Sequence, residues 1–437
     1  MQLTQAGAVV IQKVVDHGRS LDQALIEAPS QFEGSLPALK ELCFGGCRFY
    51  FYYDAIISGL VSKPLKQKDR LIHFLIVAAF YQLDHMSVPD HAVVNETVKA
   101  LKKSKQDWAR NFVNGVLRNY LRNREEIAAK LKSNATIEHR FYAFPRYLYE
   151  MIQSDWPAYY RLILGASNKK PPLTIRVNAS RVTREAYMNF LSQQGIAVHS
   201  TADSAIGITF EKPVGVMEIP GFVKGDVSVQ DESAQLVARA LDMEAGMRVL
   251  DGCAAPGGKT CLLLESKPGL GEMVAVDLPH RVAGIRENLQ RIGLTATIVD
   301  SDFIDTDAWW DGVSFDRILM DVPCSGSGVI RRHPDIRHRR QDGDIEKFHL
   351  QQLSLLNTAW KMLKPGGVLL YVTCSVFSQE NDCTVEKFLG CITDFELQSL
   401  ESVFGLKTRY GRQRLPGLHS GDGFYYCKLR RTLKETT

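Results

Sequence analysis

The chain has 437 residues, a formal net charge of +4, 45% hydrophobic residues and 23% charged residues. This length exceeds one ordinary hydrophobic core, so we expect two or three domains. No apolar tract is long enough to span a bilayer and the first residues lack an export signal, which argues against a membrane or secreted protein. Nine scattered cysteines, an odd number, favour free thiols in a reducing compartment. We therefore expect a soluble, cytoplasmic protein.

Residues 1–135 predict an all-α domain. Apolar residues recur with helical spacing from Ala8 to Ile26, and the segment 70–83 is apolar almost all round, as in the central helix of a bundle. No alternation typical of a strand occurs in this region. Cys43 and Cys47 lack a second pair that would complete a zinc site, so we interpret them as helix packing and expect no metal.

Basic residues gather toward the end of this helical region: Lys99, Lys102, Lys103, Lys105, Arg110, Arg118, Arg122 and Arg124. A solvated helix face is the ordinary explanation for such a run. The alternative is a surface that contacts nucleic-acid phosphates. The mild net charge does not decide between the two.

Residues 136–170 predict connecting helices, and Pro171-Pro172 ends them because proline cannot continue a helix. The pattern then changes. Segments 173–178 and 206–210 alternate like strands, and 184–194 has helical spacing. We expect a small α+β module over residues 171–233.

From residue 234 to the C-terminus, strand and helix patterns alternate. We predict strands at 247–251, 272–276, 296–300, 316–321, 367–373 and 423–429, and helices that include 281–291 and 350–363. The five strands up to 373 are apolar on both faces, which is typical of a buried parallel sheet. The pattern predicts a doubly wound α/β domain.

A loop of small residues, 252–258, follows the first of these strands, which ends in Asp251. Small residues let a backbone approach a ligand closely, and in a doubly wound sheet this loop lies at the ligand-binding edge. Acids at the ends of the next two strands, Asp277 and Asp302, suit ribose hydroxyls and an adenine amino group. Each acid alone is equally well explained as a helix cap. Together they indicate a pocket for an adenosine-bearing ligand.

The type of ligand follows from what the loop lacks. It has neither the G-x-G-x-x-G pattern of dinucleotide-binding proteins nor the Walker spacing ahead of Lys259. NAD and ATP are therefore disfavoured. S-adenosylmethionine, which carries no phosphate, fits better.

Two cysteines follow the fourth and fifth strands: Cys324 within DVPCSG (321–326) and Cys374 within TCS (373–375). A single cysteine is more often an inert, buried residue. Two thiols at neighbouring strand ends beside a cofactor pocket favour catalysis instead. The cysteines inside helix or strand patterns are interpreted as packing: Cys261, Cys383, Cys391 and Cys427.

Three motifs together, DGCAAPGGKT (251–260), DVPCSG and TCS, resemble the motif set of RNA cytosine-5 methyltransferases of the NOL1/NOP2/Sun family. The helical region resembles the NusB-like domain of the bacterial 16S ribosomal RNA branch of that family, the Sun/Fmu/RsmB type. The resemblance extends to RRHPDI (331–336) and GDGF (421–424), and so covers essentially the whole chain. At the position of Gly252 the family pattern has a bulkier apolar or acidic residue. We therefore expect looser packing around this glycine.

The resemblance implies a multidomain fold. A NusB-like helical RNA-binding domain would span 1–135, a helical linker 136–170 and a small α+β, RRM-like module 171–233. A Rossmann-like class I methyltransferase domain would span 234–437.

The resemblance also implies methylation of cytosine C5 in 16S ribosomal RNA through a covalent adduct. Cys374 would be the nucleophile that adds to C6, and Cys324 would assist release as a base or by promoting elimination. Asp321 would hold the cytosine edge at N3. Lys259 would stabilise the adduct or lower a thiol pKa, unless it is only a solvated lysine at a helix start.

Two sets of binding residues follow from the same resemblance. Cofactor contacts are expected from Cys253, Ala254, Ala255, Pro256, Gly257, Gly258, Lys259, Asp277, Asp302 and Asp321. Because the target base must leave its stack, an unpaired or flipped nucleotide is the expected substrate. A clamp on the RNA backbone is predicted from Arg331, Arg332, Arg337, Arg339 and Arg340.

The expected partner is 16S ribosomal RNA or a small-subunit assembly intermediate, with no DNA or membrane, and the expected state is a monomer. A transfer-RNA cytosine-5 methyltransferase is the nearest alternative, because the catalytic motifs do not distinguish RNAs. The NusB-like domain favours ribosomal RNA. A non-catalytic RNA-binding or antitermination factor is the alternative from another class, and the presence of both thiols and all pocket acids argues against it.

Overall fold

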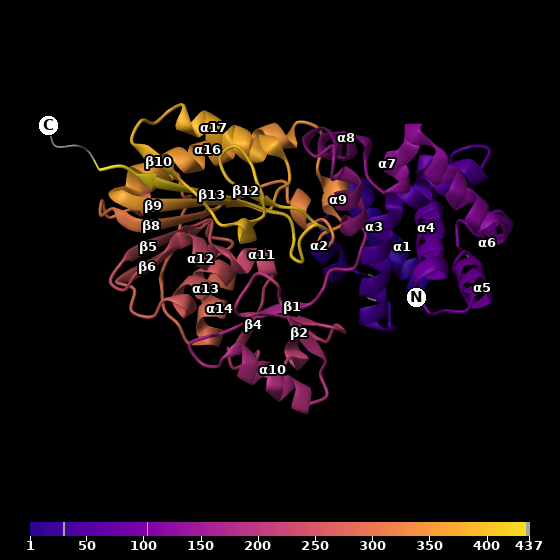
Figure 1. The fold of residues 1–437 in the computed structure, drawn as a ribbon. Coiled ribbons are helices and arrows are strands. Elements are labelled where there is room, and N and C mark those ends of the chain that lie inside the picture. Colours follow the sequence, from indigo (N-terminus) through magenta and orange to yellow (C-terminus); the bar gives the residue numbers. More distant parts are fainter. Residues whose placement is uncertain (29–30, 103, 434–437) are drawn as a thin grey trace. The chain divides into compact units, whose positions relative to one another are not determined.

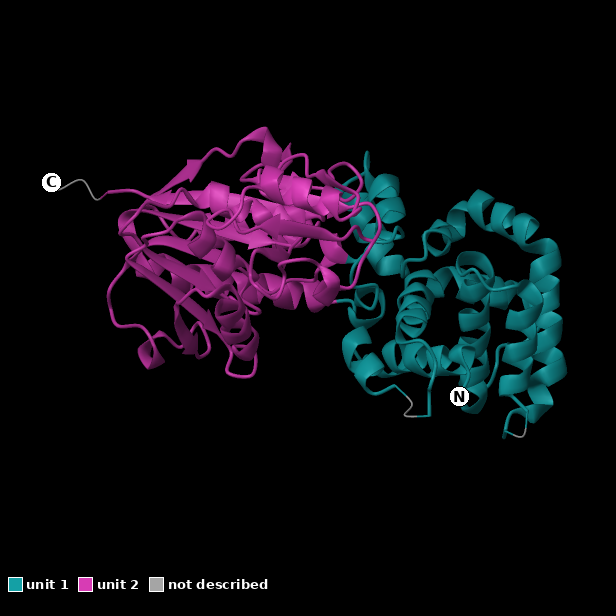
Figure 2. Cartoon of the chain, turned by 90° about the horizontal axis from the view of Figure 1, so that it is seen from below, with its two compact units in different colours: residues 1–170, 330–342 teal, residues 171–329, 343–437 magenta. Residues whose placement is uncertain are grey.

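The computed structural model describes residues 1–28, 31–102 and 104–433 (Figure 1). The chain forms two compact units, Met1–Lys170 with Ile330–Asp342 and Pro171–Val329 with Gly343–Thr437 (Figure 2). We call them the helical unit and the sheet unit. The segment 330–342 therefore packs with the helical unit although it lies within the stretch predicted as a methyltransferase domain. Lys103, one of the basic residues noted above, lies outside the described residues.

The helical unit contains no strand in its described part. Its helices are α1 (Leu3–His17), α2 (Leu21–Ile26), α3 (Leu36–Leu60), α4 (Arg70–His85), α5 (Asp90–Ala100), α6 (Arg110–Ser133), α7 (Glu138–Phe141), α8 (Arg146–Asp155), α9 (Tyr160–Ser167) and α15 (Ile336–Arg339). The prediction of an all-α region is confirmed.

Helix α4 is the central helix of this unit, as its sequence predicts, and residues 72–83 are all buried. Helices α1 and α3 pack against it. A Cβ atom on Gly45 of α3 would lie 1.8 Å from the Tyr81 ring, so the close approach of α3 to α4 requires glycine there. Cys43 and Cys47 are fully buried in the same core, which confirms their interpretation as packing.

The first part of the sheet unit is the small α+β module. Its elements are β1 (Thr174–Val177), α10 (Arg184–Gln193), β2 (Val198–Ser200), β3 (Gly207–Phe210) and β4 (Val227–Val229). The strands form an antiparallel sheet in the order β2-β3-β1-β4. The sequence predicts β1, β3 and α10 but not β2 and β4, which have only three residues each.

The second sheet has nine strands: β5 (Arg248–Gly252), β6 (Glu272–Asp277), β7 (Thr297–Asp300), β8 (Phe315–Asp321), β9 (Leu363–Thr373), β10 (Phe395–Gln398), β11 (Leu406–Lys407), β12 (Arg412–Arg414) and β13 (Phe424–Arg431). Strands β7, β6, β5, β8 and β9 lie side by side in this order and are parallel. Strand β13 continues the sheet antiparallel to β9. The five predicted parallel strands and the terminal strand are confirmed.

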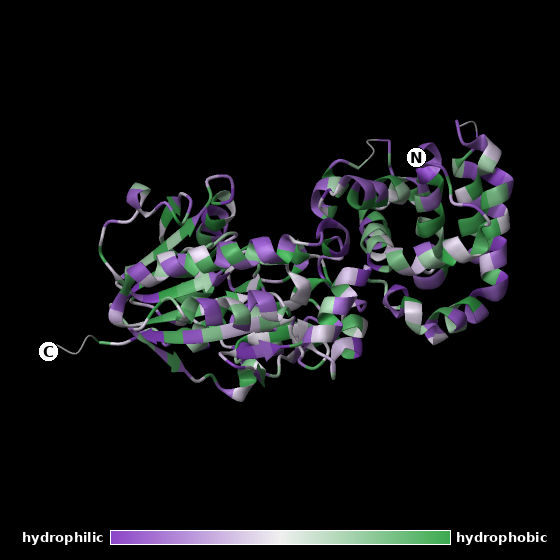
Figure 3. Cartoon of the chain, turned by 90° about the horizontal axis from the view of Figure 1, so that it is seen from above, coloured by the Kyte–Doolittle hydropathy of each residue, from purple (hydrophilic) through white to green (hydrophobic). Residues whose placement is uncertain are grey.

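Helices cover both faces of this sheet. Helices α16 (Asp344–Met362) and α17 (Asp382–Leu389) lie over one face, and α12 (Val237–Leu241), α13 (Gly258–Ser266) and α14 (Ala283–Ile292) lie over the other, while the short α11 (Glu232–Gln235) precedes α12 (Figure 1). A hydrophobic cluster fills each interface. The hydropathy colouring shows green segments along the central strands (Figure 3). The architecture is thus doubly wound, as predicted.

Two expectations about packing are wrong. A Cβ atom on Gly252 would lie 2.6 Å from Met320 Sδ and 2.8 Å from the Phe303 ring, so these side chains fill the space and the packing is not loose. Cys383 and Cys391 are exposed, because each lies on the solvent side of its segment. Cys261 and Cys427 are buried as expected.

None of the helices in the described part of the chain combines the length and the apolarity that crossing a membrane requires.

A buried ion pair joins the α+β module to the larger sheet. Arg176 of β1 donates two hydrogen bonds to Glu265 of α13, at 2.9 and 2.8 Å, and its third nitrogen donates to Gln230 at 3.0 Å. The side chains of Arg176 and Glu265 are 1% and 3% exposed. The pair therefore lies in a low-dielectric interior, where loss of one partner leaves an uncompensated charge.

Arg176→Met is expected to lower the free energy of unfolding by about 3–5 kcal/mol, because Glu265 would remain buried without its partner. The double variant Arg176→Met, Glu265→Leu should recover most of that loss. Urea denaturation, with hydrogen exchange of β1 and α13 peptides as a local readout, measures both effects.

Arg239→Ala is the matched control, because its pair with Glu401 is exposed on both sides and its loss should change stability by no more than about 1 kcal/mol. A single Arg176 variant as stable as the control variant would contradict this role of the pair.

Candidate active site

The two cysteines singled out by their motifs lie next to each other. Cys324 follows the end of β8 and Cys374 follows the end of β9, and these strands pair in parallel with Asp321 opposite Val372. Both loops therefore leave the sheet at the same edge. The two Sγ atoms are 3.3 Å apart, and both residues are partly exposed.

The two thiols are not equivalent. The hydrogen bond with Cys374 raises the pKa of Cys324 well above its ordinary value, and burial and the charges of Cys374 and Glu380 act in the same direction. Cys324 therefore keeps its proton, and its Sγ lies within hydrogen-bond distance of the Cys374 sulfur, with either sulfur able to act as the donor.

A buried carboxylate that the sequence analysis missed joins the two thiol loops. Glu380 is 0% exposed. Its Oε1 accepts from the backbone N–H of Ser325 at 2.7 Å, and its Oε2 accepts from the Ser375 hydroxyl at 2.5 Å. Burial raises the pKa of Glu380, although these donors oppose the shift. Since Ser325 follows Cys324 and Ser375 follows Cys374, one side chain fixes both loops.

Hydroxyl groups complete this support. Ser325, Ser327 and Ser375 lie within 3.0–3.2 Å of one another, and the Ser327 hydroxyl accepts from the Val376 N–H. The three serines are buried. The sequence signal for this cluster is the serine that follows each cysteine, whereas Glu380, six residues after Cys374, belongs to none of the site motifs.

Lys259 and Asp321 form an ion pair at 2.6 Å in the same region. Burial lowers the pKa of Lys259, but the pairing with Asp321 outweighs it and Cys374 adds to the rise, so the net pKa is raised and the ammonium stays charged. The Lys259 Nζ also lies 5.5 Å from the centroid of the Phe424 ring. A cation is thus held close to the Cys374 sulfur.

The loop of small residues is held by the end of β6. The backbone N–H of Ala255 donates to Asp277 Oδ2 at 2.8 Å, and Asp277 Oδ1 accepts from the Leu278 N–H and pairs with Arg281. Gly257 has a φ of +93° that favours glycine. Asp277 therefore shapes the loop. Its carboxylate has further acceptor positions that suit ribose hydroxyls.

Asp251 lies fully buried beneath this loop. Its Oδ2 accepts from the Thr260 hydroxyl at 2.6 Å, and its Oδ1 has no hydrogen-bond partner within the described ranges. Burial raises the pKa of Asp251 to about 7. A buried acceptor without a donor, at the base of a loop of small residues, fits a ligand with a cationic amino group, as S-adenosylmethionine has.

Asp302 differs from the other predicted pocket acids. It is exposed, and its Oδ1 accepts from the Ile304 N–H at 3.2 Å. This hydrogen bond belongs to a local turn. Any contact of Asp302 with a cofactor would have to come from the exposed part of the same carboxylate.

The predicted RNA clamp of five arginines is wrong for Arg337. Its side chain is 1% exposed and donates to the backbone oxygens of Arg48, Ala143 and Ser167 at 2.6–3.0 Å. The guanidinium also lies 4.0 Å from the centroid of the Phe144 ring. It closes the core of the helical unit, so it is not available to RNA.

The other four arginines of this segment differ in exposure. Arg331 is only 8% exposed, Arg332 and Arg340 are half-buried, and Arg339 is exposed and pairs with Asp335 at 3.3 Å. A run of charge in the sequence does not reveal this division, because residues 334–337 are all buried although Arg337 is charged.

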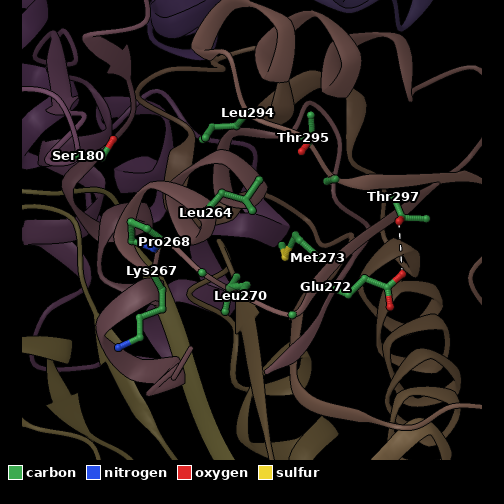
Figure 4. Close-up of a pocket in the computed structure, with 13 residues that line it drawn as sticks. Ser180, Leu264, Lys267, Pro268, Leu270, Glu272, Met273, Leu294, Thr295 and Thr297 are labelled. Carbon is green, nitrogen blue, oxygen red and sulfur yellow. Dashed lines mark hydrogen bonds between the residues drawn. The ribbon is translucent and has the colours of Figure 1, made fainter. Parts of the chain in front are cut away.

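A separate cavity of about 680 Å³ lies at the opposite edge of the sheet (Figure 4). Glu272 and Thr297, which line it, are the first residues of β6 and β7. The loop of small residues and the thiols lie at the other ends of the parallel strands, so this cavity is not part of the candidate active site.

Three family models match successive parts of the chain. A NusB family model matches residues 8–122, a ferredoxin-like domain model of RsmF/B-like methyltransferases matches 144–217, and a model of the 16S rRNA methyltransferase RsmB/F matches 238–430.

Relatives of similar length support the same assignment. The chain is 41% identical to the ribosomal RNA small subunit methyltransferase B of Vibrio cholerae, over 98% of this chain and 97% of the relative. It is 40% identical to the protein of the same name from Pseudomonas putida, over 93% and 95%. The crystal structure of PH0851 is similar in fold, with a TM-score of 0.77, 22% identity and 99% of both chains covered.

The raised pKa of Asp251 predicts a pH-dependent stability. Its folded value of about 7 lies above the ordinary value of 3.8. The stability that this group contributes is therefore full below about pH 4 and is lost as the pH rises through about 7. Asp251→Asn cannot ionise. As the pH rises from about 5 to about 8, the melting temperature of the wild type should therefore fall relative to that of Asp251→Asn.

Asp300→Asn, at an exposed acid at the end of β7, is the control and should show no such trend. A constant difference in melting temperature between Asp251→Asn and the wild type at both pH values would refute the assignment.

The distance between the thiols predicts their reactivity. A mild thiol oxidant such as diamide should join Cys324 and Cys374 in a disulfide, with two hydrogens passing to the oxidant, because little movement is needed from 3.3 Å. Glu380→Ala, and more mildly Glu380→Gln, should slow this reaction several-fold because the loops lose their common acceptor. Alkylation followed by peptide mass spectrometry measures the rate.

Glu386→Ala removes an exposed glutamate of α17 and is the matched control. Equal rates for the Glu380 and Glu386 variants would show that Glu380 does not hold the loops.

Proposed function

This chain belongs to the 16S rRNA methyltransferase RsmB/F family, and on that premise we propose that it transfers a methyl group from S-adenosylmethionine to C5 of a cytosine in 16S ribosomal RNA. The observation that carries the proposal is the thiol pair, with Sγ atoms 3.3 Å apart beside the Lys259–Asp321 ion pair. C5 of cytosine is a poor nucleophile, and a thiolate is the group that activates it.

Cys374 is the proposed nucleophile. Its thiolate adds to C6 and forms a C–S bond, and the electron pair of the C5–C6 bond moves toward C5, which becomes nucleophilic. The Cys324 sulfur, 3.3 Å away, and the charged ammonium of Lys259 lie beside the Cys374 sulfur that attacks C6. S-adenosylmethionine supplies the methyl group as a sulfonium.

Cys324 is the proposed base for release. Its proton is held mainly by the hydrogen bond with Cys374. Once the Cys374 sulfur is bonded to C6 and uncharged, its contribution to the raised pKa of Cys324 falls, and Cys324 gives its proton to solvent. Its thiolate then takes the C5 proton, the C6–S bond breaks, and Cys374 leaves as a thiolate.

Asp321 is the proposed contact for the cytosine edge. Its Oδ2 is held by Lys259, and its Oδ1 accepts no hydrogen bond from the part of the chain described here. A carboxylate oxygen suits the N4 amino group of cytosine and a proton shared with N3. Lys259 fixes the orientation of this carboxylate and balances its charge.

The cofactor is assigned to the loop 253–259 and the acids around it. Asp277 offers further acceptor positions for ribose hydroxyls, and Asp251 offers its unsatisfied Oδ1 to an ammonium group. Asp302 remains assigned to the adenine end. These residues bind and orient the donor, and the chemistry at cytosine stays with the two thiols.

The choice of ribosomal over transfer RNA rests on the two relatives, whose names state a ribosomal RNA small subunit substrate, and on the NusB family match. The catalytic residues themselves suit cytosine in any unpaired RNA. Experiment determines which cytosine is the target and whether the substrate is free RNA or an assembling subunit.

The test uses the full chain, methyl-labelled S-adenosylmethionine and 16S ribosomal RNA. Cys374→Ala should abolish methylation because no adduct forms. Cys324→Ala should accumulate a covalent RNA–protein adduct, visible as a shifted band on a denaturing gel, because release fails. Bisulfite sequencing of the RNA should then locate a single protected cytosine.

Cys383→Ala, at an exposed cysteine outside the site, is the matched control and should keep full activity. Normal methylation by Cys374→Ala would overturn the assignment of the nucleophile. Methylation of transfer RNA but not of ribosomal RNA would overturn the substrate.

A further inference from the structure

A cavity of about 540 Å³ opens in the helical unit, away from every residue assigned to catalysis. Four helices contribute its lining: Phe49 and Tyr52 on α3, Asp84 and His85 on α4, Arg124 on α6, and Phe141 on α7. Its size lies within the roughly 300–1,000 Å³ of small-molecule sites.

The walls of this cavity are aromatic. Phe49 and His85 are parallel, with ring centroids 4.7 Å apart and an interplanar angle of 17°. Phe49, Tyr52 and Phe141 are only half-buried, so parts of their rings remain accessible. Burial lowers the pKa of His85, so this ring is neutral near pH 7. Accessible neutral rings of this kind stack on nucleobases.

The polar groups of the cavity have capacity to spare. Asp84 Oδ2 accepts from the Tyr53 and Tyr120 hydroxyls at 3.0 and 2.6 Å, which fixes the carboxylate. Within residues 1–28, 31–102 and 104–433, Asp84 Oδ1 accepts no hydrogen bond, and neither the Tyr52 hydroxyl nor the Arg124 guanidinium has a hydrogen-bond or ion-pair partner. An acceptor, a hydroxyl and a cation thus surround aromatic faces.

This combination matches one class of ligand. A carboxylate oxygen accepts from the exocyclic amino group of cytosine or adenine, and a guanidinium binds a phosphate through paired N–H donors. We propose that the cavity binds an unpaired nucleobase of the RNA substrate, stacked on Phe49, Tyr52 or Phe141, with Arg124 on a neighbouring backbone phosphate.

The proposal rests on the proposed function only in taking RNA as the ligand. It applies the phosphate-contacting interpretation to one of the basic residues near the end of the helical region. Arg124 lines the cavity and contacts RNA, whereas Arg122, two residues earlier on the same helix, does not line it.

The first experiment measures binding of the full-length protein to a fluorescein-labelled single-stranded fragment of 16S ribosomal RNA, without cofactor, by anisotropy. Arg124→Ala and Phe141→Leu should each weaken binding roughly five- to tenfold. Tyr52→Phe should weaken it less, since it keeps the ring. Arg122→Ala is the matched control, because it removes the same charge from the same helix outside the cavity.

If Arg124→Ala and Arg122→Ala weaken binding equally, the effect is one of general charge and the proposal is wrong. Melting temperatures within the error of the wild type confirm that the variants are folded. Phe141→Leu keeps an apolar side chain, so its loss of affinity reports the ring rather than a collapsed core.

The second experiment uses the same RNA with 5-iodouracil, which crosslinks to stacked aromatic side chains under long-wavelength light. Crosslinked peptides should contain Phe49, Tyr52, His85 or Phe141. Crosslinks confined to other parts of the chain would overturn the proposal.

The two hypotheses fail separately. If the wild type methylates 16S RNA but these crosslinks and variant effects are absent, the cavity proposal fails and the proposed function stands. If the crosslinks and variant effects appear but no RNA is methylated, the base site stands and the proposed function fails.

Discussion

The candidate active site depends on one buried carboxylate. Glu380 is fully inside the protein, where an ionised group is costly unless donors surround it. Two of its donors come from the loops that carry the thiols, the Ser325 N–H and the Ser375 hydroxyl, and the third is the Gln352 amide on α16. Glu380, together with the buried serines, therefore joins the two loops on which Cys324 and Cys374 lie 3.3 Å apart.

The parallel sheet gives these loops their common edge. Because β5, β6, β8 and β9 all point the same way, their carboxyl ends place an acid or a thiol side by side at each strand end. Burial and pairing then give each group a different state. Asp251 has a raised pKa and an unsatisfied oxygen, Asp277 is occupied in shaping the loop, and Asp321 is held by Lys259. Similar residues at equivalent strand ends thereby acquire distinct tasks.

Residue types at strand ends are visible in the sequence, whereas the burial and pairing around them are not. This difference determines what the sequence can predict. The parallel strands follow from continuous apolar runs, and the site motifs follow from residue types at strand ends, so both are visible locally. The burial of Arg337 is not visible, because it depends on carbonyl groups of Arg48, Ala143 and Ser167 that are distant in sequence. Glu380 escapes notice for the same reason. The short strands β2 and β4 have too few residues to show a period, and they exist because β1 and β3 offer unpaired edges.

Long-range hydrogen bonds also join the α+β module to helix α13, which begins at the loop of small residues. Arg176 of β1 is paired with Glu265 near the end of α13, and Gln230 bonds both to Arg176 and to the carbonyl of Gly258, where α13 begins. On the next helix, Arg291 of α14 donates to the carbonyls of Phe222 and Val227 in the module. Helix α13 is thus held at both ends by the module, and α13 starts in the loop assigned to the cofactor. A displacement of the module relative to the sheet would have to break the buried Arg176–Glu265 pair, so the module fixes the position of α13.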